Sequence, residues 1–307
     1  MKRNHLSSSL ARFAVRAYEM CVPSRIRTGL HNRWFTRHSA RWARVRKTPQ
    51  FVIHRVAPGV RMQLHGDSLL SEMLYFGEYE PETRIFFEAY LRPGDTFLDV
   101  GANIGFYTLL AARLVAPDGP VHAFEPCSET FSRLEENVHL NRPGNVSCHR
   151  VALSSENAQA RLTLANGGYD AWNSLAAPSM GECGGSETVS TVTLDSFVRE
   201  HGLSGRRCTI KIDVEGWEAQ VLAGGREFLS GDEAPLLCVE FTEEAAALAG
   251  SSCAGLYRFL EDLGYRIFSI NPQPLEVRPF PLPDIFPNVN MIATKNPAEI
   301  QARISMP

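Results

Sequence analysis

The chain has 307 residues, of which 44% are hydrophobic and 21% charged, and its formal net charge at pH 7 is −3. This ordinary globular composition is enough for one large α/β domain with additions, and it excludes a low-complexity or disordered chain. The seven cysteines are scattered and form no C-x-x-C pair. They therefore indicate buried free thiols in a reducing compartment, and the absence of clustered ligands argues against a zinc site.

The basic residues are concentrated in residues 1–50, which we call the basic arm. The arm contains 12 Lys and Arg but a single acidic residue, Glu19, whereas the remainder contains 19 basic and 33 acidic residues. Arginines interleaved with aromatic residues have the composition of a membrane-surface segment, and no apolar run is long enough to cross a bilayer. An anionic membrane surface is one interpretation; docking on the acidic body and a transit peptide are the others. The arm also lacks the apolar core of a secretory signal, so we expect a cytoplasmic protein, with peripheral membrane association left open.

The next segment, residues 51–95, is expected to form a hairpin and a helical cap. Residues 51–66 alternate between apolar and polar around the turn Pro58-Gly59, which predicts two antiparallel strands. Residues 67–91 carry apolar positions at helical spacing with a break at Gly77, which predicts two helices.

From residue 96 to about 300 strands and helices alternate, which predicts a parallel sheet with right-handed crossovers. The expected strands are 96–100, 120–125, 146–153, 162–164, 189–193, 208–213, 235–241, 265–270 and 289–294. The expected helices are 105–115, 128–140, one from Asp195, 216–224 and 252–263. The Gly-, Ser- and Pro-rich stretch 166–187 is too long for an ordinary connection, so we expect a functional loop or lid there.

The first informative motif joins the strand at 96–100 to the following helix. Asp99 stands near the end of the strand and is followed by Gly101, Asn103 and Gly105. Such a turn presents backbone N–H groups and a helix N-terminus at the carboxyl end of a parallel strand, where open α/β sheets bind ligands. The D-x-G-x-N-x-G pattern differs from the G-x-G-x-x-G of dinucleotide folds, and an acid on the strand suits an amine rather than a pyrophosphate.

A second acid, Glu125, ends the next strand about twenty residues after the glycine turn. A carboxylate at that place can accept hydrogen bonds from both hydroxyls of a ribose. A ligand with an amine beside one acid and a ribose beside the other fits S-adenosylmethionine better than NAD. The residues therefore predict S-adenosylmethionine as the cofactor.

The second informative motif is the run from Ile210 to Glu218, in which Lys211 and Asp213 interrupt a buried strand. Asp213 is expected beside the glycine turn, and a desolvated Lys211 with a lowered pKa is a candidate base; an ion pair between the two is the structural alternative. Glu240 ends the next strand in the same way. Two carboxylates there could hold Mg²⁺, which makes Asp213 and Glu240 candidate metal ligands. His65 and His122, in the same general region, are interpreted as structural histidines.

At these motifs the chain resembles the FkbM family of S-adenosylmethionine-dependent methyltransferases. The resemblance rests on four segments in order, and it covers roughly residues 75–270. These segments are Asp99-Val-Gly-Ala-Asn-Ile-Gly-Phe-Tyr107, Ala123-Phe-Glu-Pro126, Thr193-Leu-Asp195 and Ile210-Lys-Ile-Asp-Val-Glu-Gly216. The resemblance implies a class I methyltransferase (Rossmann-like) fold with a mostly parallel seven-stranded sheet. It also implies O-methylation of a hydroxyl on a sugar, glycan or secondary metabolite.

The resemblance also implies roles for individual positions. The methionine side of the cofactor would be lined by Asp99, Gly101 and Asn103, and Glu125 would hold the ribose. The adenine would lie against Ala152 and Leu153. Glu80 resembles the acid that the family places ahead of the first strand, and residues 173–175 resemble its polar turn. The basic arm lies outside the resemblance.

Two other functions remain open from the sequence. A nucleic-acid methyltransferase would use the basic arm on phosphates, but the Asn/Asp-Pro-Pro-aromatic element of base amino-methylation is missing and the acidic body would repel a phosphate backbone. A non-catalytic module would keep the fold and use the arm as an anchor. The acids Asp99, Glu125 and Asp213 argue against this second alternative.

Overall fold

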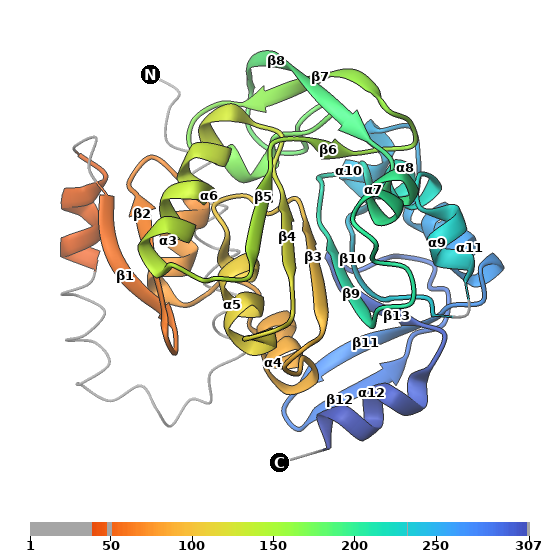
Figure 1. The fold of residues 1–307 in the computed structure, drawn as a ribbon. Helices are drawn as coiled ribbons and strands as arrows, with labels where there is room; N and C mark the ends of the chain where they lie inside the picture. The colour runs from red at the N-terminus through yellow and green to blue at the C-terminus, as the bar shows by residue number, and fades with distance from the viewer. Residues whose placement is uncertain (1–38, 48–50, 232, 306–307) are drawn as a thin grey trace.

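The computed structural model describes residues 39–47, 51–231 and 233–305. Most of the basic arm, and with it the expected membrane contact, lies outside these residues. Within the described part, helices cover both faces of a central sheet (Figure 1). No helix of this part is both long and apolar enough to span a membrane.

The central sheet has eight strands in the order β12-β11-β13-β10-β9-β3-β4-β5. Strands β5, β4, β3, β9 and β10 are parallel, whereas β13 runs antiparallel between β10 and β11. This order, with its one inserted antiparallel strand, is that of a class I methyltransferase, as expected. The sheet has eight strands rather than seven because β12 adds a hairpin at the edge. The strands are β3 (Thr96–Val100), β4 (Val121–Phe124), β5 (Val146–His149), β9 (Cys208–Ile212), β10 (Leu236–Phe241), β11 (Arg266–Pro272), β12 (Leu275–Pro279) and β13 (Val289–Thr294).

Two hydrophobic clusters fill the two faces of this sheet. Adjacent residues of one strand belong to different clusters, as Phe97 and Leu98 show, because side chains alternate along a strand. The first cluster packs α3 (Leu69–Phe76), α4 (Pro81–Tyr90), α5 (Phe106–Val115) and α12 (Pro297–Ile304), and α6 (Ser128–Asn141) contacts β2 and β5. The second packs α7 (Leu194–Glu200), α8 (Glu218–Ala223), α9 (Arg226–Ser230), α10 (Glu243–Leu248) and α11 (Cys253–Asp262).

The N-terminal cap follows the expectation closely. Strands β1 (Phe51–Ala57) and β2 (Val60–His65) form an antiparallel hairpin, and Gly77 in a left-handed conformation ends α3. A helix over 39–45 precedes them, and its Trp42 is only 2% exposed because it stacks on Tyr75. The described part of the basic arm, residues 39–47, therefore packs on the body of the protein through Trp42.

A second sheet of three strands, in the order β6-β8-β7, lies above the carboxyl ends of the central strands (Figure 1). Its strands are β6 (Ala152–Leu153), β7 (Ala158–Ala165) and β8 (Cys183–Val192). The single strand expected over 146–153 was wrong, since residues 146–149 pair with β4 whereas Ala152 and Leu153 pair with β8. The expected loop 166–187 is also shorter than predicted, because β8 begins at Cys183. The connection that remains contains the 3₁₀ helix η1 (Asp170–Trp172).

Candidate active site

A cavity of about 250 Å³ opens at the carboxyl ends of β3, β4, β9 and β10. This is the place where open α/β sheets bind ligands. Residues from the cap, from the glycine turn and from the connection after β7 also line it. Of the residues proposed from the sequence, those that line the cavity are Glu80, Gly101, Asn103, Glu125, Ala152, Leu153, Asp213 and Glu240.

The glycine turn is shaped by close packing against β9. Gly101 has φ +84°, and a Cβ atom there would overlap the carbonyl oxygen of Asp213. Asn103 also has a positive φ, of 47°. Gly105 caps the N-terminus of α5 at φ 92°, where a Cβ would meet the Leu134 side chain. Gly101 and Gly105 therefore need to be glycine for two reasons: the positive φ is unfavourable for other residues, and no space is left for a Cβ atom.

Asp99 does not line the cavity, although the sequence placed it near the cofactor's methionine. Its side chain is 2% exposed and accepts a hydrogen bond of 2.6 Å from the Thr108 hydroxyl on α5. Burial raises its pKa, while nearby Lys211 acts in the opposite direction. In this structure Asp99 joins the first strand to its helix, and a direct cofactor contact remains a prediction.

Glu125 lines the cavity directly beside the glycine turn. Its two carboxylate oxygens accept backbone N–H groups, from Asn103 at 3.0 Å and from Cys127 at 2.9 Å. Burial raises the pKa of Glu125 to about 7 in spite of these hydrogen bonds. The carboxylate is thus fixed in position by the backbone, as a receptor for a diol needs to be.

An apolar slot continues from Glu125 along β6. Ala152 and Leu153 line it together with Val151 and the indole of Trp217. The Trp217 ring is oriented by a hydrogen bond of 3.0 Å from its Nε1 to the Ser154 hydroxyl. Flat apolar walls of this kind suit an adenine ring. Trp217 was not among the residues expected at the site, although it directly follows the Asp-Val-Glu-Gly motif.

On the opposite side of the turn, Lys211 lies buried beneath the cavity floor. Its ammonium is 2.6 Å from Asp213 and 4.8 Å from the Tyr107 ring centre. Burial alone would lower the pKa of Lys211, but the carboxylates of Asp213 and Glu80 outweigh it and raise the pKa well above its ordinary value. The lowered pKa expected from the sequence was therefore wrong, and the ion-pair alternative describes the geometry.

Glu80 closes this side of the cavity from the start of α4. It takes a left-handed conformation at φ 39° and accepts a hydrogen bond of 2.7 Å from the Tyr107 hydroxyl. Burial raises its pKa, and the charge of Lys211 opposes that shift. Glu80 thus lines the cavity, and its expected contact with the cofactor stays a prediction.

Three carboxylates meet at the end of β9 and β10. Carboxylate oxygens of Asp213, Glu215 and Glu240 all lie within 4.8 Å of one another. Burial, followed by the charge of Asp213, raises the pKa values of Glu215 and Glu240 well above their ordinary range. One oxygen of Glu240 is buried without a hydrogen-bond partner. The cluster can therefore take up a proton or a cation.

Glu215 was not among the residues proposed for the site. Its backbone, at φ 54°, turns the side chain into the cavity before α8 begins. The connection after β7 holds it there: the Ser174 hydroxyl donates to its carbonyl oxygen at 2.7 Å and the Ser179 hydroxyl to its carboxylate at 3.2 Å. The same connection contributes Asp170 and Trp172 to the cavity wall. The segment expected to be a functional loop thus lines the site.

The sequence is similar to known methyltransferases. Residues 99–267 match the model of the methyltransferase FkbM domain. The chain is 34% identical to the 31-O-demethyl-FK506 methyltransferase FkbM of Streptomyces tacrolimicus, covering 44% of this chain and 60% of that protein. It is 34% identical to the hexuronic acid methyltransferase AglP of Haloferax volcanii, covering 42% and 49%. It is 30% identical to the 2-O-methyltransferase NoeI of Sinorhizobium fredii, covering 45% and 60%. The matches thus span at most 60% of these relatives' length.

Proposed function

This chain belongs to the FkbM methyltransferase family, and on that premise we propose that it transfers a methyl group from S-adenosylmethionine to a hydroxyl oxygen. The observation that carries the proposal is one cavity with two sides. Glu125 and an apolar slot stand on one side of the glycine turn, and a cluster of acids stands on the other. The first side suits a nucleoside and the second suits a reacting hydroxyl.

We assign the cofactor to the glycine turn and the β4–β6 side. The backbone of Gly101 and Asn103 would lie against its amino-acid part, Glu125 would accept the ribose hydroxyls, and the adenine would enter the slot of Leu153 and Trp217. When bound, S-adenosylmethionine supplies an electrophilic methyl group on a sulfonium sulfur. What remains for the protein is to position the acceptor and to take its proton.

The acid cluster is placed to receive that proton. Asp213, assigned as the catalytic group, shares a crowded site with Glu215 and Glu240, where the raised pKa values of the two glutamates favour proton uptake. Lys211 stays protonated and holds Asp213 in place as a buried counter-charge. Lys211 would therefore act as a positioning residue rather than as the base.

The same acids fit a divalent cation. Asp213, Glu215 and Glu240 provide oxygen ligands of the kind that Mg²⁺ prefers, and one Glu240 oxygen is buried without a partner. We therefore propose Asp213 and Glu240, joined by Glu215, as its ligands. A bound cation would lower the pKa of a hydroxyl beside it.

The acceptor class follows from the relatives. The names of these relatives refer to 31-O-demethyl-FK506, to a hexuronic acid and to a 2-O position. The proposed acceptor is therefore a hydroxyl on a sugar, glycan or secondary metabolite. Such a hydroxyl agrees with the names of these relatives, and the acid cluster of this chain could take up its proton. For the basic arm we retain contact with an anionic membrane surface as the proposal, because of its high positive charge.

The test is a calorimetric titration of the purified chain with S-adenosylmethionine and, separately, with NAD. We expect micromolar binding of the first and none of the second. Transfer of a labelled methyl group to a panel of uronic acids, glycans and macrolide alcohols would then identify the acceptor. Cofactor binding without transfer to any hydroxyl would favour the non-catalytic module, and transfer to a nucleic acid would overturn the acceptor class.

A further inference from the structure

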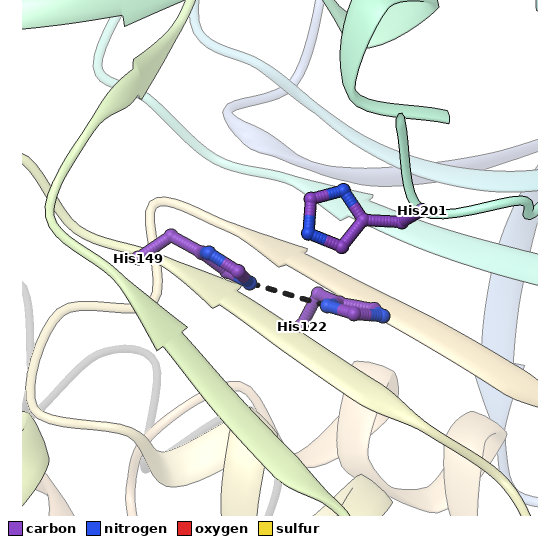
Figure 2. Close-up of side chains that lie close together, drawn as sticks. All are labelled: His122, His149 and His201. Carbon is purple, nitrogen blue, oxygen red and sulfur yellow. Dashed lines mark hydrogen bonds between the residues drawn. The ribbon is translucent and has the colours of Figure 1, made fainter. Parts of the chain in front are cut away.

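Three histidines come together away from the cavity. His122 lies on β4, His149 on the edge strand β5, and His201 directly follows α7 (Figure 2). Each offers a ring nitrogen within 4.8 Å of the others, and none of the three lines the cavity. No sequence motif predicted this cluster, because the three residues lie far apart along the chain.

The spacing of the first two ring nitrogens suits a metal ion. Nδ1 of His122 is 3.1 Å from Nε2 of His149. Two nitrogen ligands of a tetrahedral zinc ion with bonds of about 2.0–2.1 Å stand about 3.3–3.4 Å apart. A small movement of either ring, with the shared proton moved to the other nitrogen of the same imidazole, would therefore place two ligands of such a site.

The third histidine is oriented as metal ligands usually are. Nδ1 of His201 is 3.1 Å from the carbonyl oxygen of Phe197. Because a carbonyl only accepts, Nδ1 carries the hydrogen and Nε2 keeps its lone pair. Figure 2 shows the His201 ring beside the other two, with one ring nitrogen turned toward them. A hydrogen bond from the second ring nitrogen to a backbone carbonyl is the common support of a ligating histidine.

The surroundings also favour an ion. The Phe197 ring packs against all three histidines, with centroid distances of 5.2, 5.0 and 3.9 Å to His122, His149 and His201. His201 is exposed and His149 half-buried, so an ion and a water molecule can enter from solvent.

We propose that His122, His149 and His201 bind one divalent transition-metal ion of the zinc class, with water as the fourth ligand. Three imidazoles without a carboxylate select zinc, copper or nickel over magnesium or calcium. The ion would tie the edge strand β5 to α7 and so fix the end of the sheet. This site is separate from the acid cluster and does not depend on the proposed activity.

The test uses the full chain, without a histidine tag and stripped of metal by a chelator. Excess Mg²⁺ is present to occupy the acid cluster. We expect Zn²⁺ titration by calorimetry to give one tight site, and Co²⁺ to give the visible absorption of a tetrahedral complex. His201→Ala and His149→Ala should each weaken Zn²⁺ binding at least about tenfold. His139→Ala, at an exposed histidine on α6, is the matched control and should bind like the wild type.

Three results would overturn the proposal. One is no tight site in the wild type, and another is wild-type affinity in both His201→Ala and His149→Ala. The third is an equal loss in the His139→Ala control. Because His201 is exposed, its variant is expected to fold, and circular dichroism of each protein checks this. A rise in the thermal midpoint on adding Zn²⁺ to the wild type but not to His201→Ala would further support the proposal.

Discussion

The ammonium of Lys211 lies 2.6 Å from a carboxylate oxygen of Asp213, two residues along from it where β9 enters the cavity. The Lys211 side chain is 2% exposed and that of Asp213 15%. A cation this deeply buried is stable only with nearby anions, and the carboxylates of Asp213 and Glu80 supply them. The same cation keeps the acidic half of the cavity from carrying uncompensated charge.

Lys211→Met should therefore destabilise the protein strongly. Removing one partner of a buried ion pair typically lowers the free energy of unfolding by about 3–5 kcal/mol. The loss should be smaller at pH 5 than at pH 8, because the carboxyl groups of Glu80 and Asp99, whose pKa values are raised by burial, become protonated as the pH falls. Urea denaturation at both pH values measures this, with Lys211→Met/Asp213→Asn as the control that should recover part of the loss. A loss below about 1 kcal/mol would mean that the pair is not needed.

Gly101→Ala should lower the free energy of unfolding more than Gly94→Ala, a substitution at a glycine with nearly the same backbone conformation. Gly101 and Gly94 have φ values of 84° and 88°, but a Cβ at Gly94 meets open space whereas one at Gly101 meets the backbone of Asp213. Gly94→Ala should cost about 1–2 kcal/mol, which is the price of the left-handed conformation alone. Gly101→Ala should cost clearly more and also weaken binding of S-adenosylmethionine. Equal unfolding free energies for the two variants would contradict this packing.

Glu125→Gln should weaken binding of S-adenosylmethionine about tenfold to a hundredfold, since a charge-assisted hydrogen bond contributes about 1.5–3 kcal/mol. The pKa of Glu125 is raised to about 7 in the folded protein, so the carboxylate is protonated below that pH and ionised above it. Cofactor affinity of the wild type should therefore increase from pH 6 to pH 8. Calorimetry on both proteins checks this, and an identical pH profile in the variant would remove Glu125 from the ribose site.

Arg303→Met should lower the free energy of unfolding without changing the binding site for the cofactor. Arg303 on α12 forms a buried ion pair with Asp95 and donates to the Tyr90 carbonyl at 3.1 Å. We expect a loss of about 3–5 kcal/mol in the free energy of unfolding and unchanged cofactor affinity. Arg278→Met, which breaks an exposed pair with Glu276, is the control and should cost less than about 1 kcal/mol. Similar losses in both variants would show that α12 is not anchored by this pair.

Mg²⁺ added to chelator-treated protein should raise its thermal midpoint if the acid cluster binds the ion. The three crowded carboxylates repel one another, and a divalent cation removes that repulsion. Glu240→Gln should abolish the rise, whereas Glu276→Gln, at a surface acid paired with Arg278, should retain it. A midpoint that does not respond to Mg²⁺ in the wild type would leave the cluster as a proton acceptor only.

Much of the N-terminal cap and of the central domain could be predicted from the sequence because the signals are local. The strand at 96–100, the break at Gly77 and the turn at Pro58-Gly59 each follow from a few adjacent residues. The order of β3 and β9 also followed, since two charged motifs at strand ends had to meet at one edge of the sheet. Short elements such as α9, α10 and β12 were missed, because five or six residues carry too little periodicity.

By itself, the sequence determined the family, the alternation of strands and helices, and eight of the residues that line the cavity. Only the tertiary structure decided their chemical states and partners. It turned Asp99 toward Thr108, gave Lys211 its raised pKa and brought Glu215 into the cavity. The physical reason is that a pKa and a hydrogen bond depend on burial and on charges from distant segments. A motif fixes the type of a side chain, whereas packing fixes what that side chain meets.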